Sequence, residues 1–271
     1  MLRRGLPPIF RDLWLTVTVQ AAVALIMWIA AMAASSPLPA PTMQELMEHG
    51  DRLRHDEEKF PQSLEEALSL YRQASAMQPG AAAPYIRIAE VCLALGDGVK
   101  EKDKSLAWYR QGEHAAEEAI QHQEKSADAH FLLAANRGKV VNLLPFWKVS
   151  PTILADLEKH LQQALALEPS HARANHMMGM VLYRTPGPLR LMLTGKREQV
   201  EGFLLRSVES DPSSADAQLD LARFYKETGR PAQARTHAEA ILAMHDSSSS
   251  RAWIEQYRPA AEQLLKSLPT P

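Results

Sequence analysis

The chain has very little cysteine. Cys92 is the single cysteine among 271 residues, so no intramolecular disulfide can form. A chain without disulfides suits either side of a bacterial inner membrane, and the cysteine count therefore leaves the compartment open. Cys92 falls on the apolar face of an expected helix, and we therefore expect a core residue there in preference to a reactive thiol. The composition thus excludes a disulfide-stabilised scaffold.

An excess of positive charge is also missing. The formal net charge is -2 at pH 7, and without Arg3, Arg4, Arg11 and Asp12 the balance of the remaining residues is more acidic still. A nucleic-acid-binding domain usually carries a basic stripe and a clear positive charge. We therefore expect no nucleic-acid partner.

The usual signatures of enzymes and metalloproteins are absent from the sequence. There is no Gly-rich phosphate loop and no Gly-x-Ser-x-Gly nucleophile elbow. Among the ten histidines, His171 and His176 lie five residues apart, and His114 and His122 lie eight apart. A helical zinc site instead pairs histidines four residues apart with a glutamate. We expect a protein that is not an enzyme and that holds no metal or other cofactor.

One long apolar run lies near the N-terminus. Residues Leu13–Ala34 carry no charge, and about 20 apolar residues span the hydrocarbon core of a bilayer as a helix. Three arginines precede this run, and the next basic residue after it is Arg52. The positive-inside rule then keeps the N-terminus in the cytoplasm and exports the rest of the chain. We expect a single-pass anchor in a bacterial inner membrane, with a periplasmic C-terminal domain.

A cleaved secretory signal is the alternative for the same run. Ala31–Ala33 resembles a small-x-small cleavage site, but the apolar part of a signal is usually only about 7–15 residues long. We favour the retained anchor, and either alternative exports the domain. No cysteine lies near the end of the run, which excludes lipoprotein processing.

A repeated helical pattern fills the remainder of the chain. Four stretches end alike, with a small residue five positions before a final Pro or Glu, and a helical pattern with an apolar–small pair follows each one. The endings are Ala74 to Pro79, Ala119 to Glu124, Ala164 to Pro169 and Ser207 to Pro212; the pairs are Ile88-Ala89, Leu133-Ala134, Met178-Gly179 and Leu221-Ala222. This pattern resembles the tetratricopeptide motif, in which small residues let paired helices pack closely. Such arrays bury a core between neighbouring units and commonly serve for binding.

The repeat predicts an all-α, tetratricopeptide-like solenoid of about five helix pairs behind the N-terminal transmembrane helix. From Pro79 to Pro169 there are 90 residues, or two units of about 45, which is longer than the 34 residues of a standard unit. We therefore expect insertions between the two helices of the middle units, with Gly96 and Gly229 at turns. The predicted segments are 1–12 in the cytoplasm, 13–34 as anchor, 35–41 as a Pro-rich linker, 42–246 as repeats (the first pair at 42–58 and 63–78), and 247–271 as capping helix and tail.

The middle of the chain carries a more specific resemblance. Ala127–Leu144, Leu157–Pro169 and Ala174–Leu182 contain a helix, an Ala-Leu-Ala-Leu-Glu-Pro ending and a His-Met-Met-Gly run. Together they resemble the T-component family of TRAP transporters and the related regulator-of-microtubule-dynamics family. The resemblance to T-components implies an exported, non-enzymatic helical-repeat protein that works beside a solute-binding protein of a carboxylate transporter.

Two regions are candidate binding sites. In the tetratricopeptide register, five positions of each first helix face the concave side of the array. The polar and aromatic candidates there are Phe131, Lys139, Arg173, His176, Tyr183, Arg184 and Arg223, which suit an anionic or amphipathic ligand. A solvated face with ion pairs is the alternative. The other region is apolar: the expected insertions Leu143–Trp147 and Leu189–Leu193 either fold into the core or form a contact surface with Phe146, Trp147, Leu191 and Leu193.

The sequence favours a membrane-anchored, non-enzymatic scaffold on the exported side of the inner membrane. Its partner is expected to be a protein or a small apolar or anionic ligand. An accessory subunit of a TRAP-type solute transport system is the alternative that the family resemblance implies. A scaffold that forms homo-oligomers through its repeats also remains open.

Overall fold

The structure is a computed structural model of the chain, and it describes residues 27, 40–56, 60–145, 150–190, 193–244 and 253–269. The chain divides into two compact units, Met1–Pro41 and Thr42–Pro271. Of the residues described, none belongs to a helix with the length and apolar character needed to cross a membrane. The expected anchor at 13–34 lies outside the described residues, apart from Met27.

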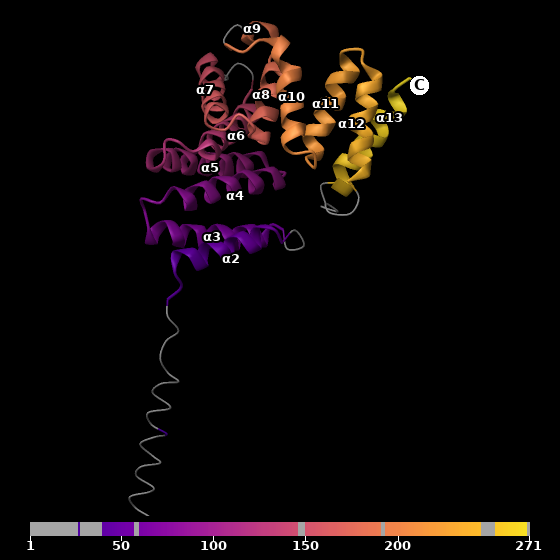
Figure 1. Ribbon diagram of the computed structural model, residues 1–271. Coiled ribbons are helices and arrows are strands. Elements are labelled where there is room, and N and C mark those ends of the chain that lie inside the picture. Colours follow the sequence, from indigo (N-terminus) through magenta and orange to yellow (C-terminus); the bar gives the residue numbers. More distant parts are fainter. Residues whose placement is uncertain are drawn as a thin grey trace, which may run out of the picture. The chain divides into compact units, whose positions relative to one another are not determined.

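The described secondary structure of the unit that begins at Thr42 is entirely helical, and successive helices pack as pairs (Figure 1). The pairs are α2 (Met43–Arg54) with α3 (Gln62–Met77), α4 (Ala82–Gly98) with α5 (Lys102–His122), α6 (Ala127–Leu143) with α7 (Pro151–Leu167), α8 (Ala172–Arg184) with α10 (Val200–Ser210), and α11 (Ala215–Glu227) with α12 (Pro231–Ala243). A π-helical turn, η4 (Trp253–Tyr257), and α13 (Arg258–Ser267) follow, and α13 packs on α12. The all-α, tetratricopeptide-like fold is confirmed.

The second helix of four pairs ends in the same way. Helices α3, α5, α7 and α10 each stop two residues before the Pro or Glu of the repeated ending. The residue after each helix donates its backbone N–H to the carbonyl of the small residue of the ending: Ala74, Ala119, Ala164 or Ser207. These four small residues are at most 1% exposed. The small residue therefore both allows close packing and accepts the bond that closes the helix.

Two aromatic–glycine contacts hold the first two pairs together. The Tyr71 ring lies against Gly50, and the Tyr109 ring lies against Gly96, so that a Cβ at either glycine would come within 2.6 Å or 2.3 Å of ring carbon. Gly96 therefore lies inside α4, where it admits a ring, and the expectation of a turn there was wrong. The hydroxyl of each tyrosine also donates to the aspartate that follows the glycine, at 2.7 Å.

The extra length of the middle units has more than one origin. In the α4–α5 pair the helices themselves are long, with 17 and 21 residues against 13 each in α11 and α12, and only Val99–Glu101 connect them. The prediction of an insertion there was wrong. A long connection does separate α8 from α10, and it contains the short helices α9 (Gly187–Arg190) and η3 (Arg197–Gln199). The α6–α7 pair is intermediate, with helices of 17 residues and a connection at 144–150.

One hydrophobic cluster runs through the described helix pairs from Leu64 to Leu268. Cys92 is fully buried in this cluster, and burial raises the pKa of its thiol to about 12. A thiol that stays protonated at neutral pH is a poor nucleophile, so Cys92 is a core residue.

Candidate functional site

The first helices of successive pairs share one polar surface, here called the inner face: the side on which α4, α6, α8 and α11 exchange side-chain contacts. Arg173 of α8 reaches past α6 to Glu90 of α4, with 2.9 Å between Nη1 and Oε1. The same guanidinium lies 3.5 Å from an oxygen of Asp128 and 4.8 Å from the centre of the Phe131 ring. Glu90 also accepts from Arg54 at 2.8 Å. Arg173 thus ties three units together.

A histidine cap fixes the neighbouring carboxylate. The Nδ1 atom of His171 accepts from the N–H of Ala174 at the start of α8, so its other nitrogen, Nε2, carries the proton and donates to Asp128 at 3.2 Å. This hydrogen bond, together with the charge of Arg173, holds the pKa of Asp128 below its ordinary value. Asp128 is therefore a fixed negative charge at neutral pH.

A second cluster joins α8 to α11 around Asp220. One oxygen of this carboxylate accepts from His176 at 3.1 Å, and the other accepts from Arg184 at 3.0 Å and Arg223 at 3.4 Å. Burial alone would raise the pKa of Asp220, but the bond from His176 and the two arginine charges bring that pKa below its usual value. Nearby, the hydroxyl of Tyr183 donates to Glu227. Partial burial and that bond raise the pKa of Tyr183 to about 12.

A pocket of about 390 Å³ opens at this cluster. It is lined by Met180, Tyr183, Arg184, Arg197, Asp220, Arg223 and Glu227. These residues come from α8, from η3 and from α11. The site brings three arginines, two carboxylates, a thioether and a phenol into one concavity, here called the arginine pocket.

The inner-face candidates take different positions in this arrangement. Arg173, His176, Tyr183, Arg184 and Arg223 all contribute to the two clusters, as described above. Lys139 forms an ion pair with Asp97 at 2.6 Å. Phe131 is only 5% exposed and lies beneath Arg173. The contacts of these residues fit the alternative of a solvated face with ion pairs. Arg184 and Arg223 nevertheless keep 63% and 46% of their side-chain surface exposed.

The described residues of the apolar insertions form no exposed apolar surface: Leu143, Leu144 and Pro145 are only partly exposed. Leu193 is 8% exposed and belongs to the hydrophobic cluster. It therefore folds into the core, as one of the two expectations had it, and is not available to a partner. Leu189 is partly buried against the same cluster. Phe146, Trp147 and Leu191 lie outside the described residues.

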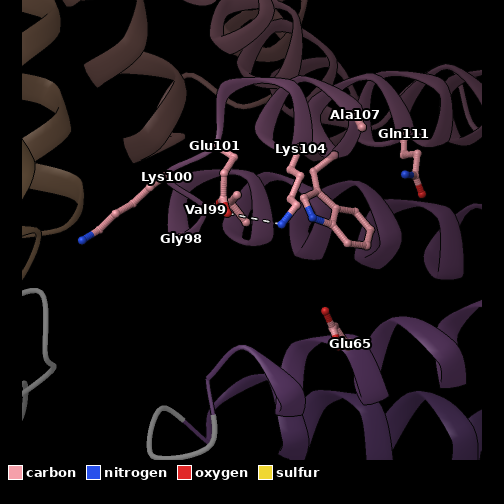
Figure 2. A pocket seen from close by; sticks show the side chains of 9 residues that line it. Glu65, Gly98, Val99, Lys100, Glu101, Lys104, Ala107 and Gln111 are labelled. Atoms are coloured by element: carbon pink, nitrogen blue, oxygen red, sulfur yellow. Dashed lines mark hydrogen bonds and ion pairs between the residues drawn. The ribbon is translucent and has the colours of Figure 1, made fainter.

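A larger pocket, of about 670 Å³, lies beside the second helices α3 and α5 (Figure 2). Figure 2 shows Glu65 of α3 facing the side of α5 that carries Lys104 and Gln111. The charged pair here, Lys104 with Glu101, is 3.3 Å long and more than 60% exposed on each side. Exposed pairs contribute little free energy, and no set of charges converges as in the arginine pocket. The inner face is therefore the better candidate site.

Sequence reasoning missed a repeated set of buried polar contacts, here called the polar relay. In three units, the residue six positions after the final Glu or Pro hydrogen-bonds with that residue's backbone carbonyl: His130 with Glu124, Asn175 with Pro169, and Gln218 with Pro212. Each of these side chains also contacts one from the second helix of its own pair: His160, Arg206 and His237, respectively. The constant spacing of six residues was visible in the sequence, but the change of residue type hid the shared role.

The described residues include no group of three or more His, Cys, Asp or Glu side chains that could hold a metal ion. The polar groups of the inner face instead bond to one another. Their fully charged carboxylates and guanidiniums suit the recognition of charged ligands.

A comparison with one solved structure agrees with the tetratricopeptide-like fold. TTC0263, a thermophilic TPR protein in Thermus thermophilus, matches with a TM-score of 0.60 and 15% sequence identity over 81% of this chain and 98% of that one. The Pseudomonas aeruginosa protein pilF matches with a TM-score of 0.48 and 14% identity, covering 81% of this chain and 90% of that chain. At these identities the likeness concerns the fold alone. No curated protein matches.

Family models divide the described array in two. A tetratricopeptide repeat model matches residues 202–254. The model of the regulator of microtubule dynamics protein 1-3 family matches residues 46–185, a span that begins within α2 and ends just after α8. Because this match covers just over half of the chain, the chain belongs to the regulator of microtubule dynamics protein 1-3 family.

Proposed function

We propose that the protein is a membrane-anchored, non-enzymatic scaffold whose inner face binds a protein partner. The observation that carries the proposal is the arginine pocket, where half-exposed Arg184 and Arg223 are held at fixed positions by the partly buried carboxylate of Asp220. Arginines that are already oriented lose little freedom when a ligand binds. The pocket is thus organised for recognition.

The electrostatics of the pocket favour binding over catalysis. A general acid or base works best with a pKa near the working pH. The pKa of Asp220 is lowered, and that of Tyr183 is raised to about 12, so neither group exchanges a proton readily near neutral pH. A non-enzymatic role is consistent with both shifts.

The location of the scaffold follows from the sequence before Thr42. The uncharged run at 13–34 is long enough to span a bilayer, and the three arginines before it favour an N-terminus in the cytoplasm. In this proposal the run anchors the chain in a bacterial inner membrane, and the helical array lies on the periplasmic side.

A site-specific crosslink would test binding and location together. A photo-crosslinking amino acid replaces Glu227, an exposed residue that lines the arginine pocket, in the full, membrane-anchored chain, and the matched control replaces exposed Glu239 on α12. We expect a discrete protein adduct from position 227 only, and digestion of the array by protease added to spheroplasts. Identical adducts from both positions, or none, would contradict the binding face; an array protected until the membrane is lysed would contradict the location.

An accessory role in solute transport is the second candidate. The motifs within 127–182 that resemble T-components favour it, and the family match is compatible with it without testing it. Genes for a solute-binding protein and a permease beside this one would support that role, and a solute-binding protein would then be the adduct at position 227. A homo-oligomeric scaffold would instead yield an adduct with a second copy of the chain.

A further inference from the structure

The connection between α8 and α10 supplies one wall of the arginine pocket. Its helix η3 carries Arg197, while the other lining residues come from α8 and α11. A standard tetratricopeptide unit joins its helices by a short turn, as Thr228–Arg230 do here between α11 and α12. The pocket in this form therefore depends on the longer connection.

A buried carboxylate holds this connection in place. Glu158 of α7 is 2% exposed, and its two oxygens accept the backbone N–H groups of Thr194 at 2.7 Å and Gly195 at 2.6 Å. Gln162, one turn further along α7, donates to the Thr194 hydroxyl at 2.8 Å. Leu193 packs into the hydrophobic cluster beside them. Helix α7 thus fixes the segment just before η3. This contact positions Arg197 in the lining of the pocket.

The hydrogen-bonding capacity of the pocket is unbalanced. Both oxygens of Asp220 accept bonds, and that side chain is 14% exposed. Glu227 accepts from Tyr183. A guanidinium has five N–H donors, whereas Arg184 and Arg223 each direct one bond to Asp220, and Arg197 is exposed. Most guanidinium donors that face the pocket are therefore available to an incoming anion, while both oxygens of Asp220 and one oxygen of Glu227 already accept hydrogen bonds.

We infer that the arginine pocket binds an acidic segment of the protein partner, in which neighbouring Asp or Glu side chains meet the guanidiniums. This inference rests on the proposed function and names the partner's chemistry. Carboxylates match the planar fork of arginine, which can bond them through two parallel N–H groups. The thioether of Met180 and the ring of Tyr183 give the pocket an apolar wall, so an apolar residue between the acidic ones fits best. Arg197 makes the insertion a determinant of specificity.

Binding of matched peptides tests the inference directly. The probe is a labelled peptide, Leu-Glu-Asp-Leu-Glu-Asp, blocked at both ends, and its counterpart has Gln and Asn in place of Glu and Asp. Affinities for the full chain in lipid nanodiscs of neutral composition are measured by fluorescence anisotropy. We expect the acidic peptide to bind at least about tenfold more tightly than its amide counterpart, and to weaken as salt is added.

Two charge-matched variants locate the effect. Arg197→Gln should remove most of the tenfold preference, and Arg110→Gln, which removes an exposed arginine on α5 far along the chain from the pocket, should leave it intact. Both variants should melt like the unaltered protein, since both side chains are exposed. Equal affinity for the two peptides, or equal behaviour of the two variants, would overturn the inference. As a further comparison, the full chain is mixed with vesicles that contain anionic lipid. If it binds these vesicles and neither peptide, the inference is overturned as well.

The outcome can be separated from that of the proposed function. If the crosslinker at position 227 captures a protein and Arg197→Gln leaves that adduct unchanged, the binding face stands and the acidic segment is wrong. If no adduct forms at position 227, the proposed function itself fails, whatever the peptides do.

Discussion

The α4–α5 and α8–α10 pairs belong to units of similar length, 45 residues from Pro79 to Glu124 and 43 from Pro169 to Pro212. They use their extra residues in opposite ways. The first pair has long helices and a three-residue connection, while the second has helices of 13 and 11 residues and a long connection. The difference teaches that the period of a repeat fixes how many residues it has to place and leaves their use open: the first pair uses them for packing, the second for a pocket.

The two pairs are accordingly held together by different forces. In the α4–α5 pair an aromatic ring fills the space above Gly96, and its hydroxyl bonds Asp97. In the α8–α10 pair Gly179 lies under Leu204, while the connection depends on buried Glu158 from the preceding pair. Loss of the Tyr109 ring should therefore destabilise the whole array. Loss of the Glu158 carboxylate should loosen only the connection between α8 and α10.

The largest effect is expected from Tyr109→Ala. This change empties the space over Gly96 and removes the bond to Asp97, so the free energy of unfolding should fall by about 3–5 kcal/mol. Urea denaturation measures it, with Arg110→Ala as the control, because that neighbouring side chain is exposed and should cost less than about 0.5 kcal/mol. Similar midpoints for the two variants would mean that the ring does not hold the pair.

A somewhat smaller effect is expected from pH in the intermediate α6–α7 pair. Burial, and then the charges of His130, Arg137 and Lys159, lower the pKa of His160 from 6.5 to about 4; Asp156 faces the same ring at 3.7 Å. The unfolded chain therefore takes up a proton that the folded protein refuses. The free energy of unfolding should fall as pH drops from about 6.5 to about 4, by at most about 3 kcal/mol from this group.

Two histidine variants isolate this contribution, because burial also lowers the pKa of His237 and gives a slope of the same sign. Denaturation of His160→Asn should show a shallower dependence on pH across that window. His114→Asn, in which an exposed residue of α5 is changed, should keep the slope of the unaltered protein. A slope that survives in His160→Asn would assign the whole effect to other groups.

The smallest effect on global stability is expected from Glu158→Ala. The change leaves the N–H groups of Thr194 and Gly195 without their buried acceptor, which costs about 1–3 kcal/mol. Detachment of the connection, which lets water reach both groups, limits the cost. Hydrogen exchange should quicken at these two amides while α4 and α5 stay protected. Lys159→Ala, at the exposed adjacent position, serves as the control, and unchanged protection of Gly195 would contradict the local role.

The features that the sequence predicted well are local ones. The helix ends before Pro79, Pro169 and Pro212 follow from the small residue and the proline, which lie within one turn of the cap. The tetratricopeptide register also placed Arg184 and Arg223 on the inner face, because it depends only on counting from those ends. The confirmed parts of the fold need no knowledge of distant contacts.

The features that the sequence did not predict depend on contacts between units. The helical pattern of α5 runs on without a break, and an excess of residues counted between prolines cannot distinguish longer helices from a loop. Arg197 lies in the connection between α8 and α10, which the tetratricopeptide register does not cover. The repeat pattern therefore could not predict that Arg197 and Arg223 line the same pocket. Asp220 lies one helical turn after Asp216, whose carboxylate also faces His176 at 3.6 Å, and that spacing was the available signal for its place in the cluster.

The polar relay has a consequence for how the repeats diverge. The His130–His160, Asn175–Arg206 and Gln218–His237 pairs make the same bridge with different chemistry. Replacement of one member alone leaves a buried polar group unsatisfied, whereas a joint replacement can restore the bridge. The two residues of each pair are therefore coupled, and a substitution at one is tolerated best together with a matching substitution at the other. Degenerate repeats of this kind are better recognised by covariation between two positions than by residue identity at either one.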